Sequence, residues 1–256
     1  MTPERAGNLL AYVGAIIHGH FVGTNGNHLS VYVAKDRATR FPSITSELCL
    51  GLAEMFAEEN IEVVASPAVG AIALAQWTAY HLTRLHQDFG GQVRIYPARI
   101  EVLALYCERE EDILYTYKDP VTSIIRPGLS NHDTIRRNDE LVLRHSGFEL
   151  KRGFASDAKS KKVLVIEDTL TTGDSAAKTV DAVISAGGIV IGLGVLVNGG
   201  NVTAEVCGVK RLESLITIKR EIFTEDECKD RGLCRRNVPI NTEFGHGKEF
   251  LARKNK

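Results

Sequence analysis

One stretch, residues 161–175, constrains the fold more than any other part of the chain. The four apolar residues at 163–166 form a short run that is typical of a strand buried on both faces of a parallel sheet. The carboxylates of Glu167 and Asp168 follow directly, at the point where such a strand leaves the sheet. Open α/β folds bind their ligands at this edge. The stretch therefore predicts a buried parallel strand that delivers two acids to a ligand site.

The loop after these acids has the composition of an anion site. It contains Thr171, Thr172, Gly173 and Ser175, and it leads into a predicted helix that runs to about Ala186. Free backbone N–H groups and the positive end of the helix macrodipole meet there, which suits a phosphate group. Because two carboxylates would repel that phosphate, we expect them to bind a neutral polyol beside it, such as the two hydroxyls of a ribose. The alternative is an ordinary βα turn in which Thr and Ser cap the helix.

The order of these residues resembles the phosphoribosyl pyrophosphate signature of the type I phosphoribosyltransferases. The shared pattern is four apolar residues, Glu-Asp, two spacers and Thr-Thr-Gly-Asp-Ser. The resemblance implies that Glu167 and Asp168 bind the ribose 2′- and 3′-hydroxyls and that the loop binds the 5′-phosphate. The loop residues concerned are Thr171, Thr172, Gly173, Asp174 and Ser175. Many relatives have glycine or another uncharged residue in place of Asp174, so we expect its side chain to point away from the phosphate.

Composition narrows the function without deciding it. The chain has 256 residues, 44% of them hydrophobic, and 31 basic against 32 acidic side chains give a net charge of −1. The hydrophobic content is ample for a buried core, and the small net charge argues against nucleic-acid binding through bulk charge. No apolar run has the length of a membrane span, and Glu4 and Arg5 precede a broken apolar pattern, so we expect a cytoplasmic protein without a signal peptide. The five cysteines, at 49, 107, 207, 228 and 234, favour reduced thiols over a disulfide framework.

The N-terminal segment predicts a helix followed by a hairpin. Apolar residues recur at helical spacing from Leu9 to Ile17, and an Asn-Gly turn at 25–26 precedes a strand with alternating apolar residues at 29–33. The segment resembles the N-terminal hood of orotate phosphoribosyltransferases, which covers the base. The alternative is a surface hairpin that caps the sheet. We assign residues 1–40 to this hood.

An α/β core with a parallel sheet is expected over residues 41–208, with a C-terminal edge and tail at 209–256 that completes the hood. The predicted core elements are helices after Pro42 and Gly70 and strands over 61–65, 93–96, 102–107 and 189–197. An edge strand at 215–218 and a capping box at 224–227, which opens a short helix, follow in the tail.

A second small-residue turn, at 66–70, joins a predicted strand to the next helix. Such a turn is again suited to an anion. The resemblance makes it the pyrophosphate loop, with Ala68, Val69 and Gly70 as binding residues. The lysine that some relatives carry in this loop is absent here. A plain βα connection is the alternative.

Residues 108–139 are charged and lack clear periodicity. A stretch of this kind inside a compact domain indicates a functional lid or disorder. The resemblance implies the lid, because members of the family close a mobile basic loop over the diphosphate. The candidate catalytic cations are Arg109, Lys118 and Arg144, with His145 beside them. For each of them the alternative is a solvated charged residue. The lid includes an apparent insertion of roughly 25 residues, which is long for such a connection.

We assign no protein residues as metal ligands. The spacing of His18, His20 and His28 fits no standard site, so we take them as hood or surface histidines, and Cys228 and Cys234 with His246 nearby make a weak zinc motif. The family resemblance implies Mg²⁺ carried mainly by the diphosphate substrate.

The implied reaction is Mg²⁺-dependent transfer of ribose 5-phosphate from phosphoribosyl pyrophosphate to a ring nitrogen of a base. Orotate is the leading substrate, in pyrimidine nucleotide synthesis, with Thr24, Thr171 and Asn198 as base-binding residues. Orotate transferases typically meet the carboxylate with a hood lysine and an arginine after the strand that follows the phosphate helix. The matching positions here are Thr24 and the 198–199 turn, so neither cation is expected. The bacterial and archaeal subgroup that the chain otherwise resembles also tends to lack the hood lysine.

Two other functions remain open. One is a salvage transferase for another base, and the other is a regulator that binds phosphoribosyl pyrophosphate without turnover. The presence of Arg109 and Arg144 and the lack of a recognisable DNA-binding domain favour the enzyme. Motifs of phosphate-loop hydrolases, dinucleotide oxidoreductases and serine hydrolases are absent from the sequence. The resemblance also implies a homodimer in which the loop of one subunit reaches the site of the other, with small molecules as substrates and no nucleic-acid or membrane partner.

Overall fold

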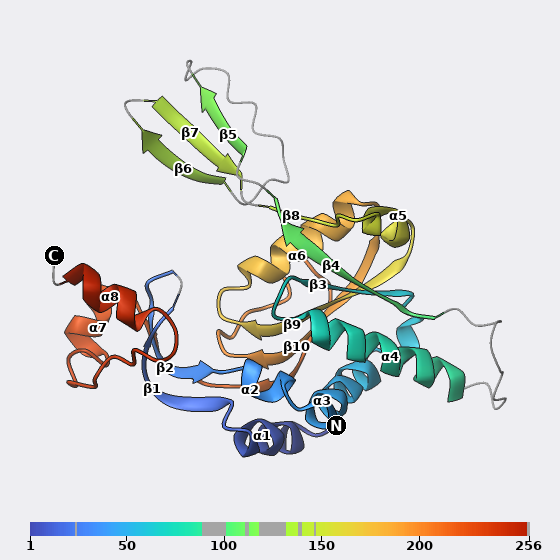
Figure 1. The fold of residues 1–256 in the computed structure, drawn as a ribbon, viewed down its shortest axis with the longest axis horizontal. Helices are drawn as coiled ribbons and strands as arrows, with labels where there is room; N and C mark the ends of the chain where they lie inside the picture. The colour runs from blue at the N-terminus through green and yellow to red at the C-terminus, as the bar shows by residue number, and fades with distance from the viewer. Residues whose placement is uncertain are drawn as a thin grey trace.

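The computed structural model describes residues 1–23, 25–88, 101–110, 113–117, 132–137, 140–145 and 147–254. It describes the backbone alone at 87–88, at 254 and in the three ranges between 113 and 145. Within these residues the chain forms a central sheet covered by helices, a small hood sheet and a third sheet that stands off the core (Figure 1).

The central sheet confirms the predicted parallel α/β core. Its strands, in spatial order, are β11 (Leu212–Thr217), β10 (Ile189–Asn198), β9 (Lys162–Leu170), β3 (Val63–Pro67), β4 (Leu103–Arg109) and β8 (Phe148–Glu149). Neighbours from β11 to β4 are parallel, and the short β8 pairs antiparallel with β4. The strand expected at 93–96 lies outside the described residues.

Helices cover both faces because β9 is apolar on both. Leu164 and Ile166 pack into a cluster with the helices α1 (Pro3–Tyr12), α3 (Pro42–Met55) and α4 (Ile72–Asp88). The alternate residues Val163 and Val165 pack on the other face with α5 (Phe154–Ala158) and α6 (Asp174–Ser185). Two short helices, α2 (Asp36–Thr39) and the 3₁₀ turn η1 (Ala57–Glu59), flank α3. Successive side chains of a strand point to opposite faces, which explains the unbroken apolar run.

The connections diverge between β3 and β9. From β3 the chain passes through α4 to β4, whereas from β9 it passes through α6 to β10 on the opposite side. The ladder between β3 and β9 ends at the pair Ala65–Val165, but β9 stays paired with β10 as far as Leu170. A crevice therefore opens beside the last residues of β9, at the topological switch point where α/β sheets bind ligands.

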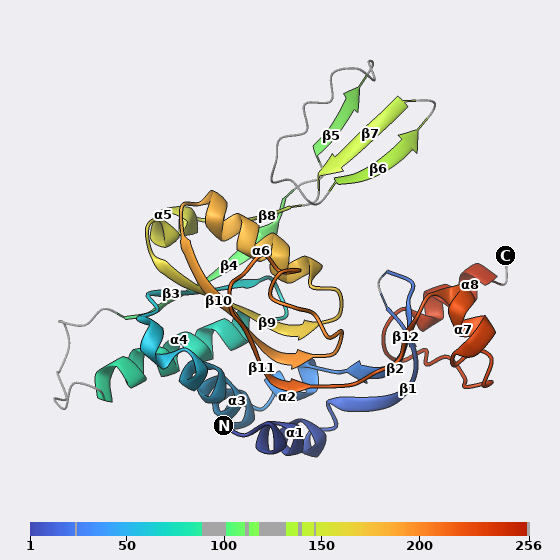
Figure 2. The same cartoon turned by 180° about the vertical axis from the view of Figure 1, so that it is seen from behind.

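The hood joins segments that are distant in sequence. Its sheet has the order β1 (Ile16–Val22), β2 (His28–Val33) and β12 (Ile222–Phe223), and the helices α7 (Glu225–Arg231) and α8 (Gly247–Lys254) lie beside it (Figure 2). The Thr224 capping box at the start of α7 is confirmed, because Thr224 Oγ1 accepts from Glu227 N at 3.3 Å and Glu227 Oε2 accepts from Thr224 N at 2.9 Å.

The first helix is shorter than its apolar spacing predicts. It ends at Tyr12, and Ile16 and Ile17, which were expected on its buried face, belong to β1 instead. Gly14 has φ +66°, a left-handed conformation that terminates helices. Pairing of Ile16 with Val33 then overrides the helical spacing.

The charged stretch at 108–139 was expected to lack regular structure, and this was wrong for part of it. The strands β5 (Ile113–Tyr117), β6 (His132–Arg137) and β7 (Glu140–His145) form an antiparallel sheet in the order β5-β7-β6. It lies beyond the ends of β4 and β8 (Figure 1). Backbone ladders form without a regular apolar alternation, which was the signal that the prediction used.

None of the helices in the described ranges combines the length and the apolar character that crossing a lipid bilayer requires.

Candidate functional site

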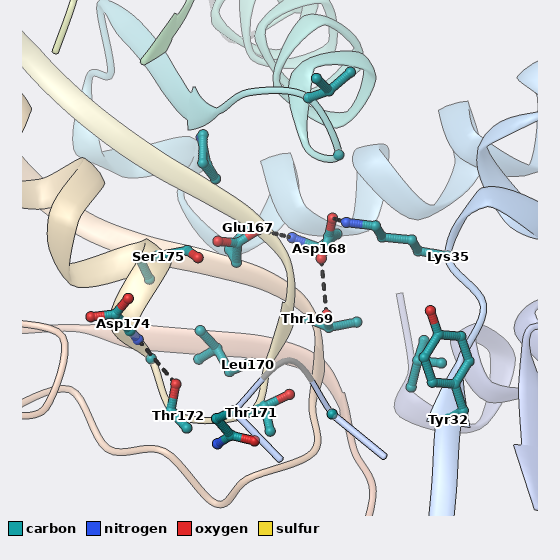
Figure 3. A pocket seen from close by; sticks show the side chains of 18 of the residues that line it. Tyr32, Lys35, Glu167, Asp168, Thr169, Leu170, Thr171, Thr172, Asp174 and Ser175 are labelled. Carbon is teal, nitrogen blue, oxygen red and sulfur yellow. Dashed lines mark hydrogen bonds and ion pairs between the residues drawn. The ribbon is translucent and has the colours of Figure 1, made fainter. Parts of the chain in front are cut away.

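A cleft of about 730 Å³ opens at the switch point (Figure 3). Its walls are the turn at 67–70, residues 167–176 and hood residues that include Tyr32 and Lys35, with Arg220 from beyond β11. The predicted phosphate loop at 171–175 and the turn at 67–70 thus meet in one cavity with the hood hairpin. The parallel topology brings the two loops to the same edge of the sheet.

The two acids lie side by side in this cleft with unlike surroundings. Glu167 is 5% and Asp168 3% exposed, and Asp168 N donates to Glu167 Oε1 at 2.9 Å. Burial raises the pKa of Glu167 to about 8, and the negative charge of Asp168 contributes to the same shift. Glu167 is therefore mostly protonated at neutral pH in the free protein.

Lys35 supplies the positive partner of Asp168. Its ammonium forms an ion pair with Asp168 Oδ2, reaching across from the end of the hood hairpin (Figure 3). Burial lowers the pKa of Lys35, but attraction to Asp168 and Glu167 outweighs burial, so the pKa is raised overall. Gly70 packs directly against this pair, and a Cβ at Gly70 would meet Lys35 Nζ and Asp168 Oδ2. A larger residue at this position would therefore displace the ion pair.

The predicted phosphate loop is assembled at the start of α6. The residues at 171–175 all line the cleft, and Gly173 precedes the helix with φ +86°. Asp174 is about half exposed and pairs with Lys178 at 2.8 Å, one turn along the helix. This ion pair occupies the Asp174 carboxylate on the helix surface, which leaves the backbone N–H groups of the first turn to an anion.

The turn at 67–70 forms the facing wall. Ala68, Val69 and Gly70 line the cleft, and the Ala68–Val69 peptide bond is cis. Ala68 N donates to Cys107 O at 2.9 Å, which ties the turn to β4. The turn itself carries no lysine, as its sequence shows, but Lys35 brings an ammonium beside Gly70.

Arg220 is the cation at the hood end of the cleft, and it changes the expected base site. Its Nη2 donates to Thr171 Oγ1 at 2.7 Å, and its guanidinium lies against Gly199. Asn198 is buried and holds the following loop instead, with Nδ2 donating to Val202 O at 2.9 Å and Oδ1 accepting from Val202 N at 3.0 Å. Asn198 does not line the cleft. The 198–199 turn carries no cation of its own, as its sequence shows, but Arg220 brings a guanidinium against Gly199 from outside the turn.

The predicted lid cations are placed unequally. Arg109 ends β4 and lines the cleft with Phe148. Arg144 lies on β7, where only the backbone is described, opposite Leu114 and Asp133. Lys118 and Thr24 fall outside the described residues.

Comparison with known proteins places this geometry in a family. No family model matches the chain. A protein of Desulforamulus reducens named orotate phosphoribosyltransferase is 30% identical over 239 residues, which cover 93% of this chain and 95% of that one. The chain belongs to the orotate phosphoribosyltransferase family. It is accordingly an enzyme of the pentosyltransferase class.

Two further orotate phosphoribosyltransferases agree. One from Chlorobium phaeobacteroides is 28% identical over 228 residues, covering 89% of this chain and 88% of that one. The crystal structure of the Mycobacterium tuberculosis H37Rv protein superposes with a TM-score of 0.51 at 20% identity, covering 84% of this chain and 96% of that chain, which supports the fold. The predicted type I phosphoribosyltransferase fold is thereby confirmed.

Sequence reasoning missed Lys35 and Arg220 in this family member. Each follows a strand, β2 or β11, within a few residues of its end. Basic residues directly after a strand on the ligand side of the sheet are the signal that could have identified them. The signal was hidden because the partners, Asp168 and Thr171, are distant in sequence.

Proposed function

We propose that this protein transfers the 5-phosphoribosyl group from phosphoribosyl pyrophosphate to orotate, with Mg²⁺ and with release of pyrophosphate. The observation that carries the proposal is the convergence in one cleft of an acid pair, a phosphate loop at a helix N-terminus and a guanidinium at the hood end. Family membership supports the transferase reaction, and Arg220 supports orotate among the possible bases.

The phosphoribosyl half of the donor fits the floor of the cleft. The 5′-phosphate accepts from backbone N–H groups at 171–175, and the neighbouring acids bind the ribose hydroxyls. Asp168, which is ion-paired with Lys35, offers carboxylate oxygens that only accept, whereas a protonated Glu167 can both donate and accept. Binding of the neutral ribose hydroxyls at these groups adds no unpaired charge to a buried site.

The diphosphate fits the opposite wall. The turn at 67–70 offers backbone groups, and Lys35 and Arg109 offer positive charge on the same side of the cleft. As the bond to pyrophosphate breaks, negative charge builds up on the leaving group and positive charge on the ribose. Preorganised cations and an acidic ribose site stabilise both, and the hood excludes water from the reacting carbon.

The donor set is consistent with magnesium. The cleft offers carboxylate oxygens of Glu167 and Asp168, which are hard ligands. Among the described residues no third histidine, cysteine or acid, Asp174 included, lies close enough to both to close a cage around an ion. This suits Mg²⁺ that is carried by the substrate and keeps several waters. When bound, Mg²⁺ would neutralise and orient the diphosphate, while Asp168 is the protein side chain best placed to hold it.

Arg220 favours a base that carries an anion. Burial lowers the pKa of its guanidinium, and Arg220 Nε is buried without a hydrogen-bond partner among the described residues. A carboxylate at this end of the cleft would satisfy that donor and the charge together. A neutral base would leave both uncompensated, which disfavours salvage of purines or uracil. Tyr32 faces the cleft from β2 and offers an aromatic surface to a planar ring (Figure 3).

A homodimer belongs to the same proposal. The sheet formed by β5, β6 and β7 stands off its own core, and Arg109 is the lid cation whose described side chain reaches its own cleft (Figure 1). A second copy of the chain would place the remaining lid cations over the diphosphate.

The decisive experiment follows pyrophosphate release from phosphoribosyl pyrophosphate and Mg²⁺ with orotate, uracil, adenine, hypoxanthine or guanine. Turnover with orotate alone is the expected result. Turnover with a neutral base would replace orotate by that base, and tight donor binding without turnover on any base would contradict the transferase itself.

A further inference from the structure

We propose a structural zinc site in the hood, formed by His20, His28, Cys228 and Cys234. One ligand atom from each of these residues lies within 4.8 Å of all the others. Three of the residues are buried and Cys234 is partly buried, and none of the four lines the substrate cleft. The site is therefore separate from the proposed chemistry, and it does not depend on which base the enzyme uses.

The distances suit a tetrahedral metal with nitrogen and sulfur ligands. Bond lengths of about 2.3 Å to sulfur and 2.0–2.1 Å to nitrogen give S···N edges of roughly 3.5 Å and N···N edges of roughly 3.3 Å. The observed S···N distances are 3.7 Å for Cys228 Sγ and His20 Nε2, 3.9 Å for Cys234 Sγ and His20 Nε2, and 3.6 Å for Cys234 Sγ and His28 Nδ1. The two imidazole nitrogens lie 2.6 Å apart and need to separate by a fraction of an ångström.

Hydrogen bonds around the cluster already orient its ligands. His20 Nδ1 lies 2.7 Å from Val238 O, and because a carbonyl only accepts, Nδ1 must carry the proton. This leaves the lone pair of His20 Nε2 directed at the other three ligand atoms. Backbone carbonyls commonly fix metal-binding histidines in this way. In addition, Cys234 N donates to Cys228 Sγ at 3.2 Å, a bond that favours the thiolate.

The ligand types select the metal. Two thiols and two imidazoles in a closed set of four are typical of structural zinc, whereas Mg²⁺ and Ca²⁺ prefer oxygen. Binding displaces the thiol protons of Cys228 and Cys234 and requires His28 to carry its proton on Nε2, so that up to two protons leave per metal ion. No oxidant or reductant is involved.

The site joins two parts of the hood that the chain connects only through the whole core. His20 is on β1 and His28 on β2, whereas Cys228 is on α7 and 208 residues away from His20. The same two parts also meet in the pairing of β2 with β12 and in the bond from Asn241 N to His20 O at 2.7 Å. A small unit with little core gains most from such a cross-link. Because β2 carries Tyr32 and leads to Lys35, the metal would also hold the hood side of the cleft.

In the sequence, His246 is the histidine nearest to the two cysteines, and the spacing of His20 and His28 fits no standard metal site. Spacing rules assume ligands from one short segment. Here the histidines come from a hairpin that folds against the C-terminal helices, so the juxtaposition is visible only in three dimensions (Figure 2).

Metal content of the purified, untagged protein tests the proposal directly. Elemental analysis should find about one zinc ion per chain after dialysis against buffer that contains no added metal. The Cys228→Ser/Cys234→Ser variant should lose it, and Cys49→Ala, which removes a buried thiol of α3 far from the cluster, should retain it. Reconstitution with Co²⁺ should give thiolate-to-metal charge-transfer absorption and the intense d–d bands of a tetrahedral site in the wild type only.

If the double variant does not fold, measurements on the wild-type protein alone still test the proposal. Wild-type protein that contains no zinc, takes up none on titration and releases no protons would overturn the proposal. If protein that is purified without reductant keeps its metal but contains a Cys228–Cys234 disulfide, the two cysteines are not the ligands, and the proposal is overturned as well. A chelator should lower the melting temperature of the wild type and of Cys49→Ala.

Discussion

Glu167 and Asp168 are neighbours in sequence, but their environments give them different charges. Asp168 has Lys35 as a counter-ion, whereas Glu167 is buried next to an existing negative charge. The two acids therefore have different roles: Asp168 is ion-paired with Lys35, whereas the raised pKa of Glu167 favours its protonated form as a hydrogen-bonding group.

Replacing Glu167 by Gln should stabilise the free protein, and more so at high pH. The folded pKa of about 8 lies above the ordinary value of 4.5, so the folded state retains a proton that the unfolded state loses between these values. Wild-type stability consequently falls as pH rises from about 4.5 to 8, and the variant lacks this loss. The melting temperature of Glu167→Gln should exceed that of wild type by several degrees at pH 8.5, at ~2–4 °C per kcal/mol, and by much less at pH 4.5. A gap that does not change with pH would show that Glu167 is not titrating in this range.

Asp168→Asn should weaken donor binding at least about tenfold, since a hydrogen bond to a charged group contributes about 1.5–3 kcal/mol. Isothermal titration with phosphoribosyl pyrophosphate and Mg²⁺ measures the change. Asp157→Asn, on the exposed face of α5, is the matched control and should bind as wild type does. Equal affinities for all three proteins would remove Asp168 from the ribose site.

Arg220→Ala should raise the KM for orotate by about 10- to 100-fold, because a charge-assisted hydrogen bond is lost. Donor affinity should fall less than the affinity for orotate, because Arg220 reaches the phosphate loop only through its bond to Thr171 Oγ1. Lys219→Ala is the control, since it removes an adjacent exposed cation that does not line the cleft. A similar loss in both variants would indicate long-range attraction of the anion rather than a contact.

At the scale of elements, the sequence was informative wherever a local pattern decides the structure. The run at 163–166 and the capping box at 224–227 depend on near neighbours, and both are confirmed. The turn predicted at 66–70 begins later than expected, because β3 continues to Pro67. The end of α1 was misplaced because Gly14 and the pairing of β1 with β2 override apolar spacing. Strands β5, β6 and β7 were missed because they lack the regular alternation of apolar residues by which strands are predicted. They are formed by pairing with one another.

Those three strands give an element-scale prediction. A small three-stranded sheet that stands off the core should open often in the free enzyme. Binding of the donor and Mg²⁺ should slow amide exchange in β5 and β7, as their loop closes over the diphosphate. Hydrogen exchange with mass spectrometry measures this, with β10 of the core as the internal reference. Strong and equal protection of β5 and β7 in both states would rule out a lid.

At the scale of the molecule, the cleft exists because the chain changes direction between β3 and β9. The parallel topology could be predicted from strand and helix order, and it placed the two loops on one edge. Sequence patterns could not predict the contacts of Lys35 and Arg220. Nor could they predict that His20, His28, Cys228 and Cys234 lie together, because all of these contacts depend on how distant parts of the chain pack against one another. Sequence patterns report local order, and these contacts are the result of the complete fold.

Donor binding should stabilise the whole fold, because the ligand contacts residues from the hood, the turn at 67–70 and the loop at 171–175 together. At a concentration 100 times Kd the gain is about 2.7 kcal/mol, which corresponds to a rise of roughly 5–10 °C in melting temperature. Differential scanning fluorimetry with and without phosphoribosyl pyrophosphate measures it. Asp168→Asn should show a smaller rise at the same concentration, and an unchanged melting temperature in the wild type would contradict the assignment of the cleft.

The hood sheet also sets the order of events during synthesis. Strands β1 and β2 leave the ribosome early, but their partners β12 and α7 follow only after the entire core, 208 residues after His20 in the case of Cys228. At ~5–20 residues per second, the hairpin waits on the order of 10–40 s for its partners. During that interval the nascent chain exposes an unpaired strand edge. Chaperones can bind this edge, and so can another nascent chain on the same polysome. The core can fold while translation continues, but the hood end of the cleft, with Arg220, is completed only near the end of synthesis.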